Sequence, residues 1–267
     1  MSARNWLGLA ILVLILSLFR SSPAPGGSLV IAHRGASSLA PENTMAAVYA
    51  ALDLRVAMVE VDVHRSLDGE LVVIHDATVD RTTDGSGLVR KLTLTELRQL
   101  DAGSWFRSRF SQERIPTLRE VLEAVKDRAI LLIELKAPET EIPTIQLVRE
   151  LDMSQQVIVQ SFDSAQIQSV KELAPDINTV LLVSRPNHGS EPIEAAQWML
   201  NTVESVGASG VAVHYNWCTS QLIELASERG LDVYVWTVDR RSKLRKFIKA
   251  GVDGIITNRP QNLSTPS

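Results

Sequence analysis

Acidic side chains stand at regular spacing inside two of the short apolar runs of this sequence. Glu60 and Asp62 lie two residues apart in one run, and Glu134 lies two residues before Lys136 in another. Residues two apart in a β-strand point to the same face, so each pair would share a face. Three converging carboxylates would repel one another, by about 4 kcal/mol for two charges at about 4 Å in an effective dielectric of about 20. The pattern therefore favours a bound divalent cation, and oxygen ligands alone favour Mg²⁺ or Ca²⁺.

Two histidines accompany these acids. His33 follows the first apolar run of the folded region and precedes Arg34, and His75 follows a later run. Histidine suits proton transfer near neutral pH, and arginine suits the oxygens of a phosphate group. The combination predicts metal-assisted phosphoryl transfer, in which the cation and Arg34 bind phosphate and the histidines move protons. The alternative interpretation is an ion network in which Arg34 and Lys136 neutralise the carboxylates without chemistry.

The chain from residue 29 onward predicts a scaffold that brings strand ends together. Short apolar segments without polar alternation are separated by amphipathic helical segments, which is typical of parallel strands covered on both faces. Thr117 with Glu120, and Thr93 with Glu96, form capping boxes that mark helix starts. Eight such strand–helix units in about 240 residues predict an α/β fold, the (β/α)8 TIM barrel, with a doubly wound open sheet as the competitor. The expected strands are Leu29–Ala32, Met58–Val63, Ala129–Leu135, Val157–Gln160, Thr179–Val183, Gly210–His214, Asp232–Trp236 and Gly254–Thr257.

The alternation is interrupted once, after the second strand. Roughly fifty residues precede the helix at Thr117, and they include a short strand candidate at Leu71–Ile74. We expect a small insertion here, at about residues 76–116, on a loop at the carboxyl ends of the strands, where barrel active sites form.

The first 28 residues differ in composition from the rest. Residues 6–19 are almost entirely apolar, Arg4 precedes them, and residues 21–28 are rich in Ser, Pro and Gly. The run is short for a membrane span, which needs about 20 apolar residues, but it fits a secretory signal. We expect residues 1–28 to form a signal peptide or uncleaved signal anchor plus linker. The domain at residues 29–267 would then lie outside the cytoplasm, exported or associated with the membrane through residues 6–19.

Composition excludes several classes of protein. The 267-residue chain has a formal charge of -4 and a pI of about 5.8, so binding to nucleic acid is not expected. One cysteine, Cys218, excludes an internal disulfide framework, and we expect it to be a buried apolar residue. The oligomeric state does not follow from these properties.

Many short blocks stand in a definite order over about residues 30–260 of the sequence. The first blocks are His33-Arg34-Gly35, Pro41-Glu42-Asn43-Thr44, Glu60-Val61-Asp62-Val63, Asp68-Gly69, His75-Asp76 and Arg81-Thr82-Thr83. The later blocks are Leu100-Asp101-Ala102-Gly103, Ile115-Pro116-Thr117-Leu118, Glu134-Leu135-Lys136, Gln160-Ser161-Phe162 and Trp236-Thr237-Val238. Together, in this order, these blocks resemble the glycerophosphodiester phosphodiesterase family. One block departs, because Asn258 stands where the family often has Asp, and we expect this to affect only a local ion pair.

The resemblance implies a metal-dependent barrel that cleaves glycerophosphodiesters to glycerol 3-phosphate and an alcohol through a cyclic phosphate. Matched by position, the implied metal ligands are Glu60, Asp62 and Glu134, and the general acid and base are His33 and His75. Arg34 and Lys136 match residues that contact the phosphate, and Trp236 matches an aromatic residue at the alcohol end of the substrate. Two alternatives stay open: a lysophospholipase D acting on membrane lysophospholipids, and a non-catalytic protein that binds glycerophosphodiesters.

Overall fold

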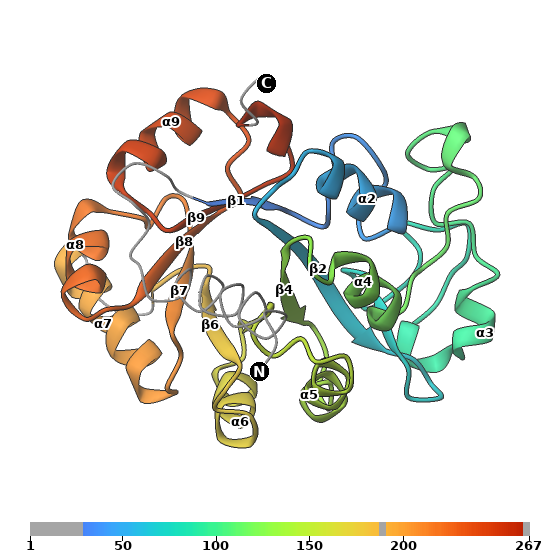
Figure 1. Cartoon of the computed structure of the whole chain (residues 1–267), viewed down its shortest axis with the longest axis horizontal. Coiled ribbons are helices and arrows are strands. Elements are labelled where there is room, and N and C mark those ends of the chain that lie inside the picture. Colours follow the sequence, from blue (N-terminus) through green and yellow to red (C-terminus); the bar gives the residue numbers. More distant parts are fainter. Residues whose placement is uncertain (1–28, 187–190, 264–267) are drawn as a thin grey trace, which may run out of the picture.

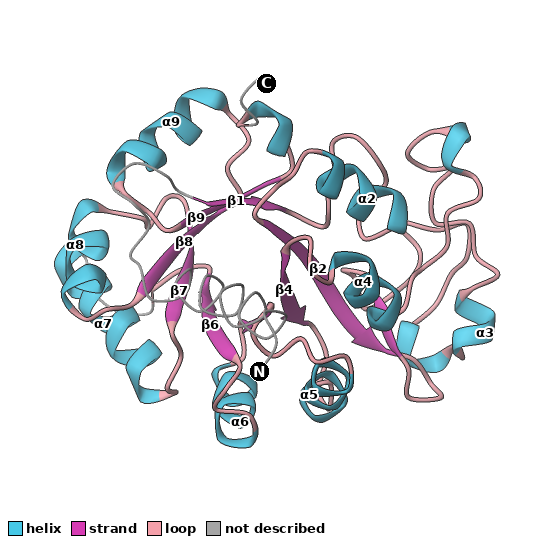
Figure 2. Ribbon diagram, viewed as in Figure 1, coloured by secondary structure: helices cyan, strands magenta, loops and turns pink. Residues whose placement is uncertain are grey.

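The computed structural model of the chain describes residues 29–186 and 191–263, so the expected signal or anchor at residues 1–28 lies outside the described residues. Eight parallel strands form a closed ring that is surrounded by helices (Figures 1 and 2). The ring runs in the order β1-β9-β8-β7-β6-β5-β4-β2, and β2 pairs with β1 to close it. The predicted (β/α)8 barrel is therefore confirmed, and the open doubly wound sheet is excluded.

The barrel strands agree with the expected ones to within two residues at each end. They are β1 (Leu29–Ala32), β2 (Met58–Arg65), β4 (Ile130–Leu135), β5 (Val157–Ser161), β6 (Asn178–Val183), β7 (Gly210–His214), β8 (Asp232–Trp236) and β9 (Gly254–Thr257). Their inward side chains fill the barrel with a buried apolar cluster that includes Ile31, Leu132 and Tyr234. This packed layer gives the polar residues above it a rigid base.

Helices pack around the ring, and their starts follow local capping chemistry. Both predicted capping boxes are present, from Thr117 to Glu120 and from Thr93 to Glu96. Cys218 is buried, as expected. No helix in the described ranges is both long enough and apolar enough to cross a membrane. The helices are α2 (Met45–Asp53), α3 (Leu94–Leu97), α4 (Leu118–Val125), α5 (Glu141–Glu150), α6 (Ser164–Leu173), α7 (Pro192–Ser205), α8 (Ser220–Glu228) and α9 (Arg241–Ala250), with 3-10 turns at Val89–Lys91, Ser108–Phe110 and Pro260–Asn262.

The segment between β2 and α4 forms a lobe to one side of the barrel, beside α2 and α4 (Figure 1). It begins with β3 (Leu71–Val73), which pairs antiparallel with β2, and it has a buried apolar cluster of its own around Leu97 and Ile115. The amide of Ile74 donates to the carbonyl of Asp62 at 3.0 Å. This contact places His75, the next residue, beside the end of β2.

Candidate active site

The three predicted carboxylates meet inside the barrel. Parallel pairing of β2 with β4 sets Asp62 opposite Glu134, and one oxygen from each of these residues and from Glu60 lies within 4.8 Å of the others. Glu60 and Asp62 are fully buried and Glu134 is 7% exposed. Burial and the charges of its two neighbours raise the pKa of Glu60 well above its usual range. Burial and the charge of Asp62 raise the pKa of Glu134 to about 7. The expected convergence of these acids is confirmed.

The residues around this acidic group fit a divalent cation. Arg34 Nε lies 3.2 Å from Asp62 Oδ2, and Lys136 Nζ lies 2.7 Å from Glu134 Oε1. Arg34 also pairs with Glu42, so the positive charges of Arg34 and Lys136 do not balance the three carboxylates. Asp62 Oδ1 is buried and has no hydrogen-bond partner. An unpaired buried carboxylate oxygen is costly unless it meets a cation, and an all-oxygen donor set suits Mg²⁺ or Ca²⁺.

A tight turn after β1 directs Arg34 toward the acids. Arg34 and Gly35 both adopt positive φ, 55° and 76°, and the amide of Arg34 donates to Glu60 Oε2 at 2.8 Å. A Cβ on Gly35 would lie 2.5 Å from the carbonyl carbon of Ala47, so only glycine fits at this position. Asn43, in the loop before α2, donates through Nδ2 to Asp62 Oδ2 at 2.8 Å. The loop therefore fixes the orientation of the central carboxylate.

His33 is held by an amide whose own direction is fixed. Asn258 Nδ2 donates to Asp239 Oδ2 at 2.9 Å, which turns Asn258 Oδ1 toward His33 Nδ1 at 2.6 Å. An oxygen at this distance requires the proton on Nδ1, so Nε2 is free to accept a proton. Burial, with the charge of Arg34, lowers the pKa of His33 to about 4, and the ring is neutral near pH 7. The expectation that Asn258 affects only an ion pair was wrong, because it sets the tautomer of His33.

His75 is held from the opposite side. Its Nδ1 lies 2.6 Å from Asp76 Oδ1, and its Nε2 lies 3.3 Å from Lys136 Nζ. The side chain of His64, on β2, donates from Nε2 to the carbonyl of His75 at 3.0 Å. His75 therefore presents Nε2 toward the residues expected to bind phosphate, while Asp76 fixes the ring through Nδ1.

Trp236 lies at the end of β8 and belongs to an aromatic row. Its Nε1 donates to the carbonyl of Ala212 at 3.0 Å, and its ring meets Phe162 and His214 edge-on at centroid distances of 5.6 and 5.3 Å. Phe162 is 46% exposed, and Lys136 Nζ lies 5.9 Å from its ring centroid. The row therefore offers an apolar surface next to the cationic part of the site.

Comparison with known proteins decides the family. The model of the glycerophosphoryl diester phosphodiesterase family matches residues 33–262. The chain belongs to this family. A glycerophosphodiester phosphodiesterase from Caldanaerobacter subterraneus subsp. tengcongensis is 40% identical over 246 residues, which cover 88% of this chain and 96% of the relative. As a member of this family, the protein is an enzyme, a phosphodiesterase.

Solved structures agree with the family. A phosphodiesterase from Oleispira antarctica, in complex with the product sn-glycerol-3-phosphate, superposes with a TM-score of 0.80 at 33% identity, covering 89% of this chain and 95% of that one. A glycerophosphodiester phosphodiesterase from Agrobacterium tumefaciens gives a TM-score of 0.78 at 32% identity, covering 89% and 99% of the two chains.

The structure gathers seven of the predicted site residues around the acidic group, reaches the eighth, Trp236, only through Phe162, and adds others. Asp76, Asp239 and Asn258 hold the two histidines, and Glu42 and Arg81 join the same hydrogen-bonded group. Asp76, Glu42 and Arg81 lie in the short blocks quoted from the sequence, and Asn258 stands in the block that departs from the family. Their positions could be read there, but their contacts could not.

We expect divalent cations to stabilise the folded chain through the acidic group. A ligand at about 100 times its Kd adds roughly 2.7 kcal/mol, which for this chain length is on the order of 5–10 °C in Tm. The change Glu60→Gln keeps the shape but removes one ligand charge, so most of the Mg²⁺- or Ca²⁺-dependent rise in Tm should disappear. Differential scanning fluorimetry with and without EDTA measures it. Glu228→Gln, an exposed helix position, is the matched control. An equal cation-dependent rise in both variants would contradict the metal assignment.

Proposed function

We propose that this chain hydrolyses glycerophosphodiesters to glycerol 3-phosphate and an alcohol, with a divalent cation held by Glu60, Asp62 and Glu134. The observation that carries the proposal is the buried acidic group flanked by two histidines, each fixed at Nδ1 by its own partner. Membership of the family supports it, and so does the product bound in the structure of the Oleispira relative.

The cationic side chains bind and orient the phosphate. Arg34 and Lys136 lie on either side of Asp62, with Arg34 Nε at 3.2 Å and Lys136 Nζ at 3.8 Å from its two oxygens. A phosphate drawn to this point would meet a guanidinium that can donate two hydrogen bonds and an ammonium point charge. When bound, the cation neutralises charge on the phosphoryl oxygens as a Lewis acid.

The two histidines move protons in opposite directions. We propose that His33 accepts the proton of the glycerol hydroxyl next to the phosphate, because its Nε2 is neutral and unprotonated. The hydroxyl oxygen attacks phosphorus, the bond to the alcohol oxygen breaks, and His75 Nε2 protonates the leaving alcohol. Asp76 holds the ring of His75 in place through Nδ1 for this step. Lys136 Nζ, near Nε2 in the free chain, would pair with the substrate phosphate instead.

The first step gives a five-membered cyclic phosphate, and its internal nucleophile gains from proximity. Water then opens the ring with the two histidines in reversed roles, which yields glycerol 3-phosphate. The alcohol leaves toward the aromatic row of Phe162, Trp236 and His214, where an apolar surface can accept varied groups.

We expect the full-length chain, purified in detergent, to release glycerol 3-phosphate from glycerophosphocholine. EDTA should abolish the release, and Mg²⁺ or Ca²⁺ should restore it, because the acidic group is unbalanced without a cation. A coupled assay for glycerol 3-phosphate measures the rate. Activity that resists the chelator would remove the cation from the mechanism. A higher rate on lysophosphatidylcholine, assayed in parallel, would favour a lysophospholipase D, and the absence of turnover on both would favour a binding protein.

We expect His33→Ala and His75→Ala each to lower kcat by about 10²–10⁴-fold, the usual contribution of a positioned general acid or base. Neither change should alter the circular dichroism spectrum, because both side chains lie at the end of a strand and not in the apolar core. Steady-state kinetics on glycerophosphocholine gives the comparison. A folded variant with kcat within twofold of the wild type would exclude that histidine from proton transfer.

We propose that residues 1–28 export the enzyme or tether it to a membrane, on the basis of the apolar run at residues 6–19 after Arg4. We expect the chain to be found outside the cytoplasm of an expressing bacterium, and the change Leu12→Arg in the apolar run to hold it inside. Fractionation with an antibody to the folded domain measures this. Equal recovery of both forms in the cytoplasm would contradict the proposal.

A further inference from the structure

Arg81 lies in the lobe between β2 and α4, and its guanidinium binds two carboxylates at once. One edge meets Asp76, with Nε at 2.7 Å from Oδ2 and Nη2 at 3.1 Å from Oδ1. The other edge meets Glu42, with Nη2 at 2.8 Å from Oε1 and Nη1 at 3.0 Å from Oε2. Both contacts are bidentate, the arrangement in which a guanidinium adds geometric specificity to charge.

Each of these carboxylates leads to a residue of the site. Asp76 Oδ1 accepts from His75 Nδ1 at 2.6 Å, and Glu42 Oε1 accepts from Arg34 Nη1 at 2.7 Å. The five side chains form a continuous chain from the ring that would protonate the leaving alcohol to the guanidinium that would bind the phosphate. Arg81 is the middle member of this chain, and it contacts neither His75 nor Arg34 directly.

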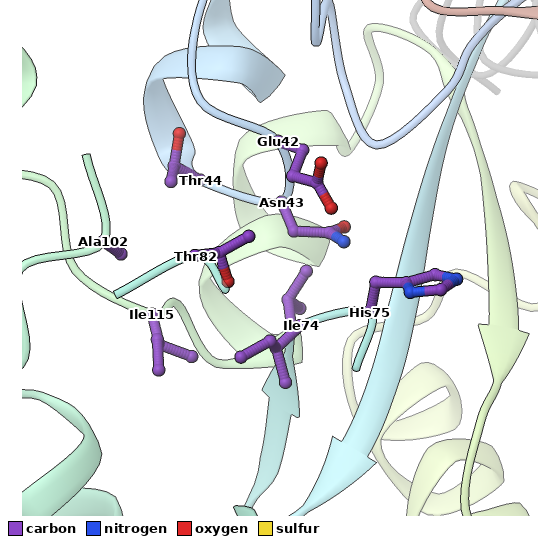
Figure 3. A pocket seen from close by; sticks show the side chains of 9 residues that line it. Glu42, Asn43, Thr44, Ile74, His75, Thr82, Ala102 and Ile115 are labelled. Atoms are coloured by element: carbon purple, nitrogen blue, oxygen red, sulfur yellow. The ribbon is translucent and has the colours of Figure 1, made fainter. Parts of the chain in front are cut away.

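This chain of contacts is packed at its Glu42 end and open to solvent at Arg81, whose side chain is 45% exposed. In Figure 3, Glu42, Asn43 and His75 lie close together, with Thr82 and Ile115 of the lobe beside them. The cavity that these residues line has a volume of about 10 Å³, room for no more than roughly one water molecule. Only about 15% of the Glu42 side chain is exposed. Hydrogen bonds from Arg81, with the charge of Arg34, lower the pKa of Glu42 against the effect of burial.

We propose that Arg81 is a positioning residue of the reaction, which holds His75 and Arg34 at a fixed separation through Asp76 and Glu42. The inference rests on the proposed function. Through Arg81, the lobe thereby links the residue proposed to protonate the leaving alcohol with the residue proposed to bind phosphate. Arg81 does not touch the reacting atoms, and its effect passes through the two carboxylates.

The geometry requires arginine at this position and not only a positive charge. A guanidinium offers two donor edges in one plane, whereas the lysine ammonium is a point charge that cannot pair bidentately with two carboxylates. Losing one edge frees either His75 or Arg34. A displacement of about 1 Å at a reacting group can cost about 10²-fold in rate.

The test compares Arg81→Gln and Arg81→Lys with Arg109→Gln, an exposed arginine of the same lobe that stacks on Phe110 and serves as control. We expect kcat on glycerophosphocholine to fall about 10–100-fold in both Arg81 variants and to stay within twofold in the control. Millimolar guanidinium should restore part of the activity of Arg81→Ala. The double variant Arg81→Gln with Asp76→Asn should lower kcat by less than the product of the two single fold-losses, because both changes break the same contact between Arg81 and Asp76.

The outcomes separate this inference from the proposed function. A wild-type chain that releases no glycerol 3-phosphate overturns the proposed function. An active wild type with Arg81→Gln within twofold of it overturns the positioning role alone. Full activity in Arg81→Lys would show that charge suffices and would overturn the role of the two-edged contact. If Arg81→Gln does not fold, the activity of Arg81→Lys and the recovery of Arg81→Ala activity by guanidinium test the same point. A folded Arg81→Ala variant whose activity guanidinium does not raise also counts against the proposal.

Discussion

Mutual repulsion among three buried carboxylates is the constraint on which the rest of the site depends. Glu60, Asp62 and Glu134 are brought together by the register of β2 and β4, which the barrel fixes through its closed hydrogen bonding. Burial and the neighbouring like charges raise the pKa of Glu60 and Glu134, and a bound divalent cation would offset both effects. Neighbouring groups with positive or donor character surround these carboxylates. The backbone amide of Arg34 donates to Glu60, and the side-chain amide of Asn43 donates to Asp62. The side chains of Arg34 and Lys136 pair with Asp62 and Glu134.

The two histidines proposed to transfer protons are likewise held by neighbours that are themselves fixed. Each histidine is fixed at Nδ1 by an acceptor, and each acceptor is fixed by a further charged residue, Asp239 for Asn258 and Arg81 for Asp76. His33 has a neutral amide as its partner and His75 has a carboxylate. Burial and the charge of Arg34 lower the pKa of His33, which suits this ring to the role of base in the proposed reaction.

The sequence predicted the barrel and the members of the site for physical reasons. Buried parallel strands leave apolar runs without alternation, and residues two apart must share a face, so the positions of Glu60, Asp62 and Glu134 followed directly. The role of Asn258 could not be predicted, because its contact with His33 joins residues 225 positions apart and depends on a side-chain rotation set by Asp239. The double contact of Arg81 could not be predicted for a similar reason, since its two partners come from separate loops and nothing local to it signals such a contact.

The groups that carry the proposed chemistry are unevenly distributed along the chain. Apart from Asn258 and Asp239, which brace His33, they all lie between His33 and Lys136, whereas the aromatic row comes from β5, β7 and β8. In the proposed reaction, the reacting groups and the surface that would receive the alcohol therefore lie in different halves of one ring, joined by hydrogen bonds between backbones. If the aromatic row receives the alcohol as proposed, changes in the loops after the later strands would alter which alcohol is accepted without touching the acidic group. The part of the barrel proposed to carry the reaction would then stay constant while the part proposed to receive the alcohol varies.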